Sequence, residues 1–170
     1  MDAIEALITR RSVRHFTTGA VSPQALETML RAAMQAPSAG NEQPWHFVVL
    51  QDRALLEKIT TFHPYADMLH HAPLAVLVCG DERLEKYPGH WVQDCSAAAE
   101  NLMLAAHAQG LGSVWLGVEP DAERVWGMRQ LLRLPLEVHP LALIAIGHPA
   151  EEPRKVDRFN PQRIHYDRWE

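Results

Sequence analysis

The chain has few of the residues that mark disulfide scaffolds, metal centres and membrane spans. Its 170 residues include two cysteines, Cys79 and Cys95, at a spacing that fits neither a zinc motif nor a redox pair, so we expect free, buried thiols. No uninterrupted apolar run approaches the ~18 residues that a membrane helix needs, and the first five residues do not begin a signal peptide. We therefore expect a cytoplasmic location and no membrane partner.

Positive charge is also scarce. The 16 Lys and Arg residues are outnumbered by 21 Asp and Glu residues, which gives a net charge of -5. Such a chain has no broad positive field for nucleic acid, so we expect no nucleic-acid partner. The hydrophobic fraction of 47% is that of a folded globular protein, and 170 residues are most simply one domain spanning residues 1–170.

The basic residues that are present include a cluster near the start, Arg10-Arg11-Ser12-Val13-Arg14. Arginine suits a phosphate because its planar fork donates two parallel, charge-assisted hydrogen bonds, and Ser12 adds a neutral donor. The alternative is a solvated helix end, where cations complement the helix dipole. On local chemistry alone, both interpretations stay open.

Helical and strand patterns alternate along the chain. Helices are predicted over residues 2–10, 23–35, 52–59, 93–109 and 121–132, and strands over 45–50, 74–79, 113–118 and 141–147. The continuously apolar strand 74–79 is expected to be central and covered on both faces. The alanine-rich helix 93–109 allows close approach of a neighbour, which could be a partner subunit. The polar tail, residues 148–170, carries Tyr166 and Trp169 and is expected to lie against a surface, its own or a partner's.

A second candidate binding element is the loop of residues 37–45, which reads PSAGNEQPW. Prolines define its ends, and its interior offers a hydroxyl, a glycine and two carboxamides. Such uncharged donors and acceptors suit a flat heterocycle. The alternative is an ordinary capped loop between a helix and a strand.

Taken together, four segments resemble the nitroreductase family of FMN-dependent oxidoreductases, in its short branch. The resemblance covers nearly the whole chain, in order and at the family's usual spacing. It is carried by Arg10-Arg11-Ser12-x-Arg14, by Pro37-Ser38-Ala39-x-Asn41-x-Gln43-Pro44-Trp45, by Gln93-Asp94-x-Ser96-Ala97-Ala98 through Gln109-Gly110-Leu111-Gly112-Ser113-x-Trp115, and by Asp157-Arg158-Phe159.

The resemblance implies an α+β fold with a central, mainly antiparallel sheet wrapped by helices. It also implies an intertwined homodimer in which the long helices pack together. The C-terminal arm, residues 148–170, would extend onto the partner. Two FMN molecules would lie at the interface, each contacted by both subunits.

The resemblance also implies roles for individual residues. The phosphate and ribityl chain of FMN would meet Arg10, Ser12 and Arg14, with Arg11 nearby and Arg158 completing the site. The partner subunit would contribute Pro37, Ser38, Ala39 and Asn41, with Gln43 as a further neighbour of the flavin. The backbone N–H of Gly117 would approach flavin N5, with Leu116 against the ring.

Two positions depart from the family pattern. Ala39 stands where a second serine is common, so a hydroxyl is missing from the loop. A lysine often lies two residues before the arm's arginine, but Val156 occupies that position and Lys155 lies one residue earlier.

The remaining histidines and aromatics have plainer interpretations. Nothing in the spacing of His63, His70 and His71 predicts convergent ligands, so we expect surface or loop histidines and no metal site. Tyr87 and Trp91 could line a substrate pocket, although core or rim packing is the alternative. We find no triad, and we expect no catalytic side chain because the flavin carries the chemistry.

Three functions are therefore considered. The first is an NAD(P)H-dependent FMN oxidoreductase that passes hydride through flavin N5 to a nitroaromatic, quinone or related conjugated acceptor in a ping-pong cycle. The second is a specialised flavin enzyme on the same scaffold, such as a dehalogenase, a desaturase or a flavin-fragmenting enzyme. The third is a non-enzymatic flavin-binding dimer. The sequence does not choose between NADH and NADPH.

Overall fold

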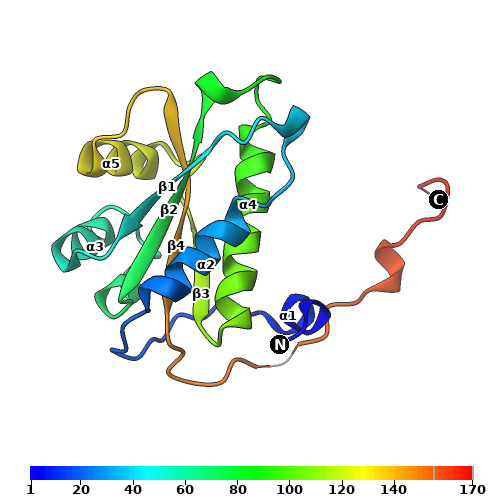
Figure 1. Ribbon diagram of the computed structural model, residues 1–170, viewed down its shortest axis with the longest axis horizontal. Coiled ribbons are helices and arrows are strands. Elements are labelled where there is room, and N and C mark those ends of the chain that lie inside the picture. The colour runs from blue at the N-terminus through cyan, green and yellow to red at the C-terminus, as the bar shows by residue number, and fades with distance from the viewer. Residues whose placement is uncertain (155, 170) are drawn as a thin grey trace.

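The computed structural model describes residues 1–154 and 156–169 and places an antiparallel sheet between two layers of helices (Figure 1). The sheet has the order β1-β2-β4-β3, with strands β1 (Trp45–Leu50), β2 (Leu74–Asp81), β3 (Gly112–Gly117) and β4 (Val138–Gly147). The α-helices of the described chain are α1 (Ala3–Thr9), α2 (Pro23–Ala33), α3 (Arg53–Thr60), α4 (Trp91–Ala108) and α5 (Ala122–Leu132). Single turns of 3-10 helix are η1 (Ala39–Asn41), η2 (Asp67–His70), η3 (Glu82–Leu84) and η4 (Pro161–Arg163). The predicted α+β fold class is confirmed.

Strand β2 shows how the layers are built. Its side chains alternate, so Val76 and Val78 pack beneath α2 and α4 while Leu77 and Cys79 pack against α3 and α5. Both faces are therefore covered, and every residue of β2 is buried. This confirms the central position predicted from its continuous apolar run.

The helix ends follow the predicted signals. The hydroxyl of Ser22 accepts a hydrogen bond from the Ala25 N–H at 3.1 Å and caps α2, which begins at Pro23. Helix α4 ends just before Gly110, whose φ of 77° lies in the left-handed region that glycine adopts without strain.

The last strand begins earlier than the sequence predicts. We expected β4 to start at residue 141, but it starts at Val138 and includes His139 and Pro140. The register with β2 shifts at Val78 and Cys79, opposite Pro140. A bulge tolerates a proline because the ladder is already interrupted there.

The C-terminal segment leaves the sheet beside α1 and runs away from the body (Figure 1). It starts at a bridge between Phe16 and Pro149. Beyond that point its described residues are exposed, including Phe159 at 74%, Tyr166 at 83% and Trp169 at 85%. Of the two surfaces expected for this tail, the chain's own surface does not cover these aromatics.

The two cysteines are free and buried, as predicted. Burial raises the pKa of Cys79 to about 12 and raises the pKa of Cys95 further. Within residues 1–154 and 156–169, no helix combines the length and the apolar character needed to cross a membrane.

Candidate functional site

The basic segment runs along the outer edge of β3. Ser12 forms a parallel bridge with Ser113, and the Val13 N–H donates to the Ser113 carbonyl at 2.9 Å. The Val13 side chain is buried against Gly112, where an added Cβ would come within 2.7 Å of it. Because successive side chains of an extended segment point to opposite sides, Ser12 and Arg14 face outward.

One cavity of about 550 Å³ collects several of the predicted phosphate ligands. The residues lining it are Arg11, Ser12, Arg14, Glu151, Glu152, Pro153, Arg154, Val156 and Arg158. The two sequence-distant parts that the resemblance assigned to the phosphate, the basic segment and Arg158, therefore come together, although two glutamates share the cavity. Lys155 lies outside the described residues.

The three N-terminal arginines differ in what they contact. The Nε of Arg10 donates to Glu100 on α4 at 3.2 Å, which directs it toward the helix. Arg11 donates to the carbonyl oxygens of Arg154 and Val156, which ties the C-terminal segment to the basic segment. Arg14 has no hydrogen-bond or ion-pair partner in the described part of the chain, so its donors are available to a ligand.

The loop of residues 37–45 lies apart from this cavity and has hydrogen bonds both within itself and to other segments. Gly40, Asn41 and Gln43 have φ values of 51°, 56° and 50°. Ser38 Oγ accepts from the Gln43 N–H at 3.1 Å, and Gln43 Nε2 donates to Asn41 Oδ1 at 3.1 Å. Pro37 is exposed and Ala39 is half-buried. These residues do not join Arg14 within one chain.

Beneath this loop lies a buried pair of carboxyl groups, Glu42 and Asp94. Asp94 Oδ1 accepts from the Ala39 N–H at 3.0 Å, and Glu42 Oε2 accepts from the N–H groups of Lys86 and Tyr87 at 2.6 and 3.1 Å. The other oxygen of each carboxyl group is buried without another partner. The pair thus fastens the loop to α4 and to the segment that precedes it.

The two carboxyl groups affect each other's pKa. Burial raises the pKa of Asp94, and the neighbouring Glu42 raises it further. Burial also pushes the pKa of Glu42 upward, but the hydrogen bonds from Lys86, Tyr87 and Asp94 outweigh it and leave that pKa lowered. The environment thus favours the charged form of Glu42 and the protonated form of Asp94.

At the far end of β3, the backbone of Gly117 faces the open edge of the sheet. The Val118 N–H donates to the Leu141 carbonyl at 3.1 Å, so these residues form a hydrogen-bonded pair. Gly117 and Ala142 form the neighbouring pair, in which N–H and C=O point away from the partner strand. Because β3 is the last strand of the sheet, the Gly117 N–H points outward.

The surroundings of Gly117 leave room for a ligand. A Cβ added there would meet no atom closer than 4.0 Å. The side chain of Leu116, by contrast, is buried in the core against the layer of α3 and α5. Any contact of Leu116 with a ligand at this edge would therefore be made by its backbone.

Two side chains that the sequence did not single out for this site contact the Gly117 carbonyl. His63 Nε2 lies 2.9 Å and Arg124 Nη1 lies 3.1 Å from the carbonyl oxygen. Of the two settings predicted for the histidines, surface or loop, His63 lies in a loop, but its side chain is only 1% exposed, and its ring nitrogens face the Gly117 carbonyl and the Tyr65 N–H. Neither residue belongs to a recognisable motif, so only the fold brings them together.

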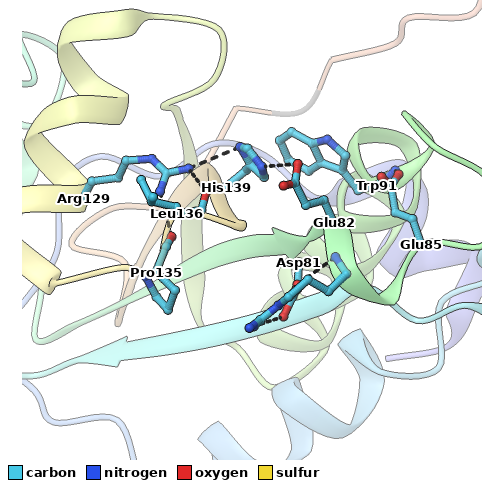
Figure 2. Close-up of polar contacts among 9 residues, drawn as sticks. Asp81, Glu82, Glu85, Trp91, Arg129, Pro135, Leu136 and His139 are labelled. Atoms are coloured by element: carbon cyan, nitrogen blue, oxygen red, sulfur yellow. Dashed lines mark hydrogen bonds and ion pairs between the residues drawn. The ribbon is translucent and has the colours of Figure 1, made fainter.

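Trp91 is a packing residue. Its ring stacks on His139 with centroids 5.3 Å apart, and His139 lies between Glu82 and Arg129 at 3.0 and 3.3 Å (Figure 2). A Cβ on Gly80 would come within 2.5 Å of the Trp91 ring. The packing interpretation is therefore confirmed for Trp91.

Tyr87 is exposed and lies over Gly40 of the 37–45 loop, where an added Cβ would come within 2.5 Å of its ring. Among the described residues, no three His, Cys, Asp or Glu side chains converge in a way that could hold a metal ion.

The structure is thus an α+β protein whose last strand, β3, has serine and arginine side chains beside one end and an outward peptide N–H at the other. Residues 7–63 and 63–148 match the nitroreductase family. The chain belongs to that family, and the resemblance seen in its motifs is confirmed.

Individual relatives agree over the full length. A protein of Methanothermobacter thermautotrophicus, provisionally named an NADH dehydrogenase/NAD(P)H nitroreductase, is 50% identical over 99% of this chain and 88% of its own length. A crystal structure of a provisionally named NADH dehydrogenase/NAD(P)H nitroreductase from Parabacteroides distasonis is 37% identical, covers 98% of both chains and has a TM-score of 0.94. A provisionally named nitroreductase from Desulfovibrio desulfuricans, crystallised in complex with FMN, is 30% identical, covers 100% of this chain and 99% of its own and has a TM-score of 0.85.

Proposed function

We propose that this protein is an NAD(P)H-dependent FMN oxidoreductase that reduces a nitroaromatic, quinone or related conjugated acceptor. The observation that carries the proposal is the outer edge of β3. It offers Ser12 and Arg14 beside Ser113, and at Gly117 an outward N–H on a residue whose added Cβ would meet no atom closer than 4.0 Å. Ser113 and Gly117 are four steps apart along the strand, about 13 Å at the usual rise, which suits a ligand with a phosphate at one end and a flat ring at the other.

The described residues fit FMN chemically. Arg14 has donors without a protein partner, Arg158 lines the same cavity, and the two together offer the charge-assisted bonds that a phosphate prefers. Arg10 and Arg11 serve the site differently, since their contacts with Glu100 and with the arm orient the segment. When bound, FMN would supply the redox chemistry, taking hydride from NADH or NADPH at N5 and releasing it to the acceptor in a ping-pong cycle.

The chain's own residues would bind and orient rather than react. The Gly117 N–H would donate a hydrogen bond at the ring, and the absence of a side chain there would let the ring approach the backbone. No side chain is assigned as a nucleophile or a base.

A homodimer belongs to the same proposal. An apolar groove of about 510 Å³ lies between α1, α2 and α4, lined by alanines and by Leu7 and Leu104. The exposed aromatics of the arm, residues 148–170, need a surface, and the partner subunit would supply one. The partner would also bring Pro37, Ser38, Ala39, Asn41 and Gln43 to the flavin. We treat residues 1–170 as one FMN-binding domain, and the cytoplasmic location stays a prediction.

Flavin binding is tested first. The purified protein should carry FMN or take it up on titration, and NADH or NADPH should bleach the yellow flavin under anaerobic conditions. Adding a quinone or a nitroaromatic should restore the colour. A protein that binds no flavin would refute the proposal, and bound flavin that no nicotinamide reduces would favour the non-enzymatic dimer.

Arg14→Ala tests the phosphate assignment. We expect FMN affinity to fall by about 1.5–3 kcal/mol, the value of a hydrogen bond to a charged group. Arg31→Ala is the matched control, because Arg31 is exposed on α2 and pairs with Glu27 at 2.7 Å. Equal affinities for the two variants would mean that Arg14 does not contact the cofactor.

A further inference from the structure

The carbonyl of Gly117 is unusual for an edge strand, because both of its lone pairs are used. In a sheet, the outward C=O of the last strand normally faces water. Here it accepts from His63 at 2.9 Å and from Arg124 at 3.1 Å, while the N–H of the same residue points to the same side. The two side chains thus complete the hydrogen bonding of the carbonyl and leave the N–H for a ligand.

The hydrogen-bond pattern fixes the protonation state of His63. The Tyr65 N–H points at His63 Nδ1 at 3.4 Å, so Nδ1 is the acceptor and Nε2 carries the hydrogen that goes to Gly117. Burial lowers the pKa of His63, and the charge of Arg124 lowers it further. The imidazole is therefore neutral near pH 7, and its one N–H, at Nε2, points at the Gly117 carbonyl.

Arg124 is itself held from several sides. It belongs to the first turn of α5, and Asp121 caps that turn by accepting from the Arg124 N–H at 3.1 Å. Its guanidinium lies 3.5 Å from the Asp121 carboxylate and stands over the Tyr65 ring, 5.2 Å from the centroid. Its side chain is 20% exposed, and so a cation is fixed at the edge where the ligand would bind.

We infer that His63 and Arg124 are positioning residues for Gly117, which hold its carbonyl so that its N–H faces the cofactor, and that the Arg124 charge favours the reduced flavin. This inference rests on the proposed FMN function. The physical reason is that a bare outward carbonyl would present its negative end to a ring that gains electrons. Two donors offset that dipole, and the guanidinium adds positive charge.

The test measures the midpoint potential of FMN bound to the holoenzyme. Arg124→Met should weaken binding of reduced FMN relative to oxidised FMN about tenfold, equivalent to about 30 mV in a two-electron couple. Arg124→Lys keeps the positive charge, so its midpoint potential should stay close to that of the wild type. Arg129→Met is the matched control, because Arg129 also lies on α5 and donates to backbone carbonyls, those of Pro135 and Leu136 (Figure 2).

His63 is tested with two variants. His63→Leu removes the donor and should weaken FMN binding, whereas His63→Gln can still donate to the carbonyl and should restore it. If His63→Leu does not fold, His63→Gln alone distinguishes the two roles. A donor role predicts that His63→Gln binds FMN as the wild type does, whereas a purely packing role predicts that it binds FMN more weakly.

A flavin-free measurement separates this inference from the proposed function. The Gly117 carbonyl and the Val118 N–H belong to one peptide group, so losing a donor should move the Val118 amide proton resonance upfield in the apoprotein. A wild-type protein that binds no FMN would refute the proposed function, while the Val118 resonance would still test the positioning. Unchanged potential and unchanged Val118 resonance in Arg124→Met would overturn the inference, as would an equal shift in Arg129→Met.

Discussion

We predict that Glu42 and Asp94 share a proton, which Asp94 carries, and that this proton helps to hold the loop of residues 37–45 in place. Asparagine at position 94 has the same shape as the protonated acid. Its oxygen can accept from the Ala39 N–H, and its amide can donate to Glu42. We expect Asp94→Asn to fold normally and to hold the loop in place.

Asp94→Ala breaks the same contacts. It leaves the Ala39 N–H without its acceptor, and an unsatisfied buried donor costs about 1–3 kcal/mol. We expect the free energy of unfolding of the apoprotein to fall by at least that amount. Urea denaturation measures it, and Asp52→Asn, at an exposed helix cap, is the control for the acid-to-amide change in Asp94→Asn.

The pH dependence has a definite sign. The folded pKa of Asp94 is raised above its usual value of 3.8, so the native state keeps a proton that the unfolded chain releases. The stability that Asp94 gives to the fold therefore falls as pH rises from 3.8 through the folded pKa. The lowered pKa of Glu42 acts oppositely, stabilising the fold above pH 4.5 and losing that effect as pH falls through its folded pKa. Lys86 and Tyr87 face the pair through their N–H groups, and His90 acts on it through its charge.

Asp94→Asn should therefore gain stability over the wild type as pH rises from 4 to 8, because the amide has no proton to lose. Two results would refute the shared proton. One is that the free energy of unfolding changes with pH in the same way for the wild type and for Asp94→Asn. The other is that Asp94→Asn is as unstable as Asp94→Ala at every pH from 4 to 8.

Three further outcomes are expected. Gly112→Ala places a Cβ 2.7 Å from the Val13 side chain, so urea denaturation should show a loss of about 1–3 kcal/mol, and a second change, Val13→Ala, should relieve only part of it because the Val13 Cβ is itself 2.7 Å from the added atom. The hydrogen bond from Arg83 lowers the pKa of Asp81 to about 2, so Asp81 stabilises the fold above pH 4 and loses that effect as pH falls toward 2. In Asp81→Asn, the free energy of unfolding should therefore depend less on pH between 4 and 2 than it does in the wild type. Both cysteines should react with a thiol reagent only as the protein unfolds in urea, because burial hides them and raises their pKa values.

Sequence patterns predicted the elements whose burial is regular. Strand β2 was found by its unbroken apolar run because both of its faces are covered. The start of β4 was missed because His139 and Pro140 interrupt the apolar pattern, and the bulge that tolerates the proline depends on pairing with a distant strand.

The site was only partly accessible to the same reasoning. The basic segment was found because arginine clusters have a chemical signature, and Arg158 was found only through the resemblance to the family; Arg11, Ser12, Arg14 and Arg158 line one cavity. His63, Arg124 and Glu42 were missed because their roles come from tertiary hydrogen bonds to backbone groups, which leave no spacing in the chain.

The outer edge of β3 also bears on solubility. An exposed edge strand can pair with the edge of another molecule, which is a route to aggregation. The Ser12 bridge covers the first part of this edge, and His63 and Arg124 block one carbonyl at its end, which leaves the Gly117 N–H open. A ligand bound there would cover the remainder, so the cofactor-free protein should be the form that aggregates first.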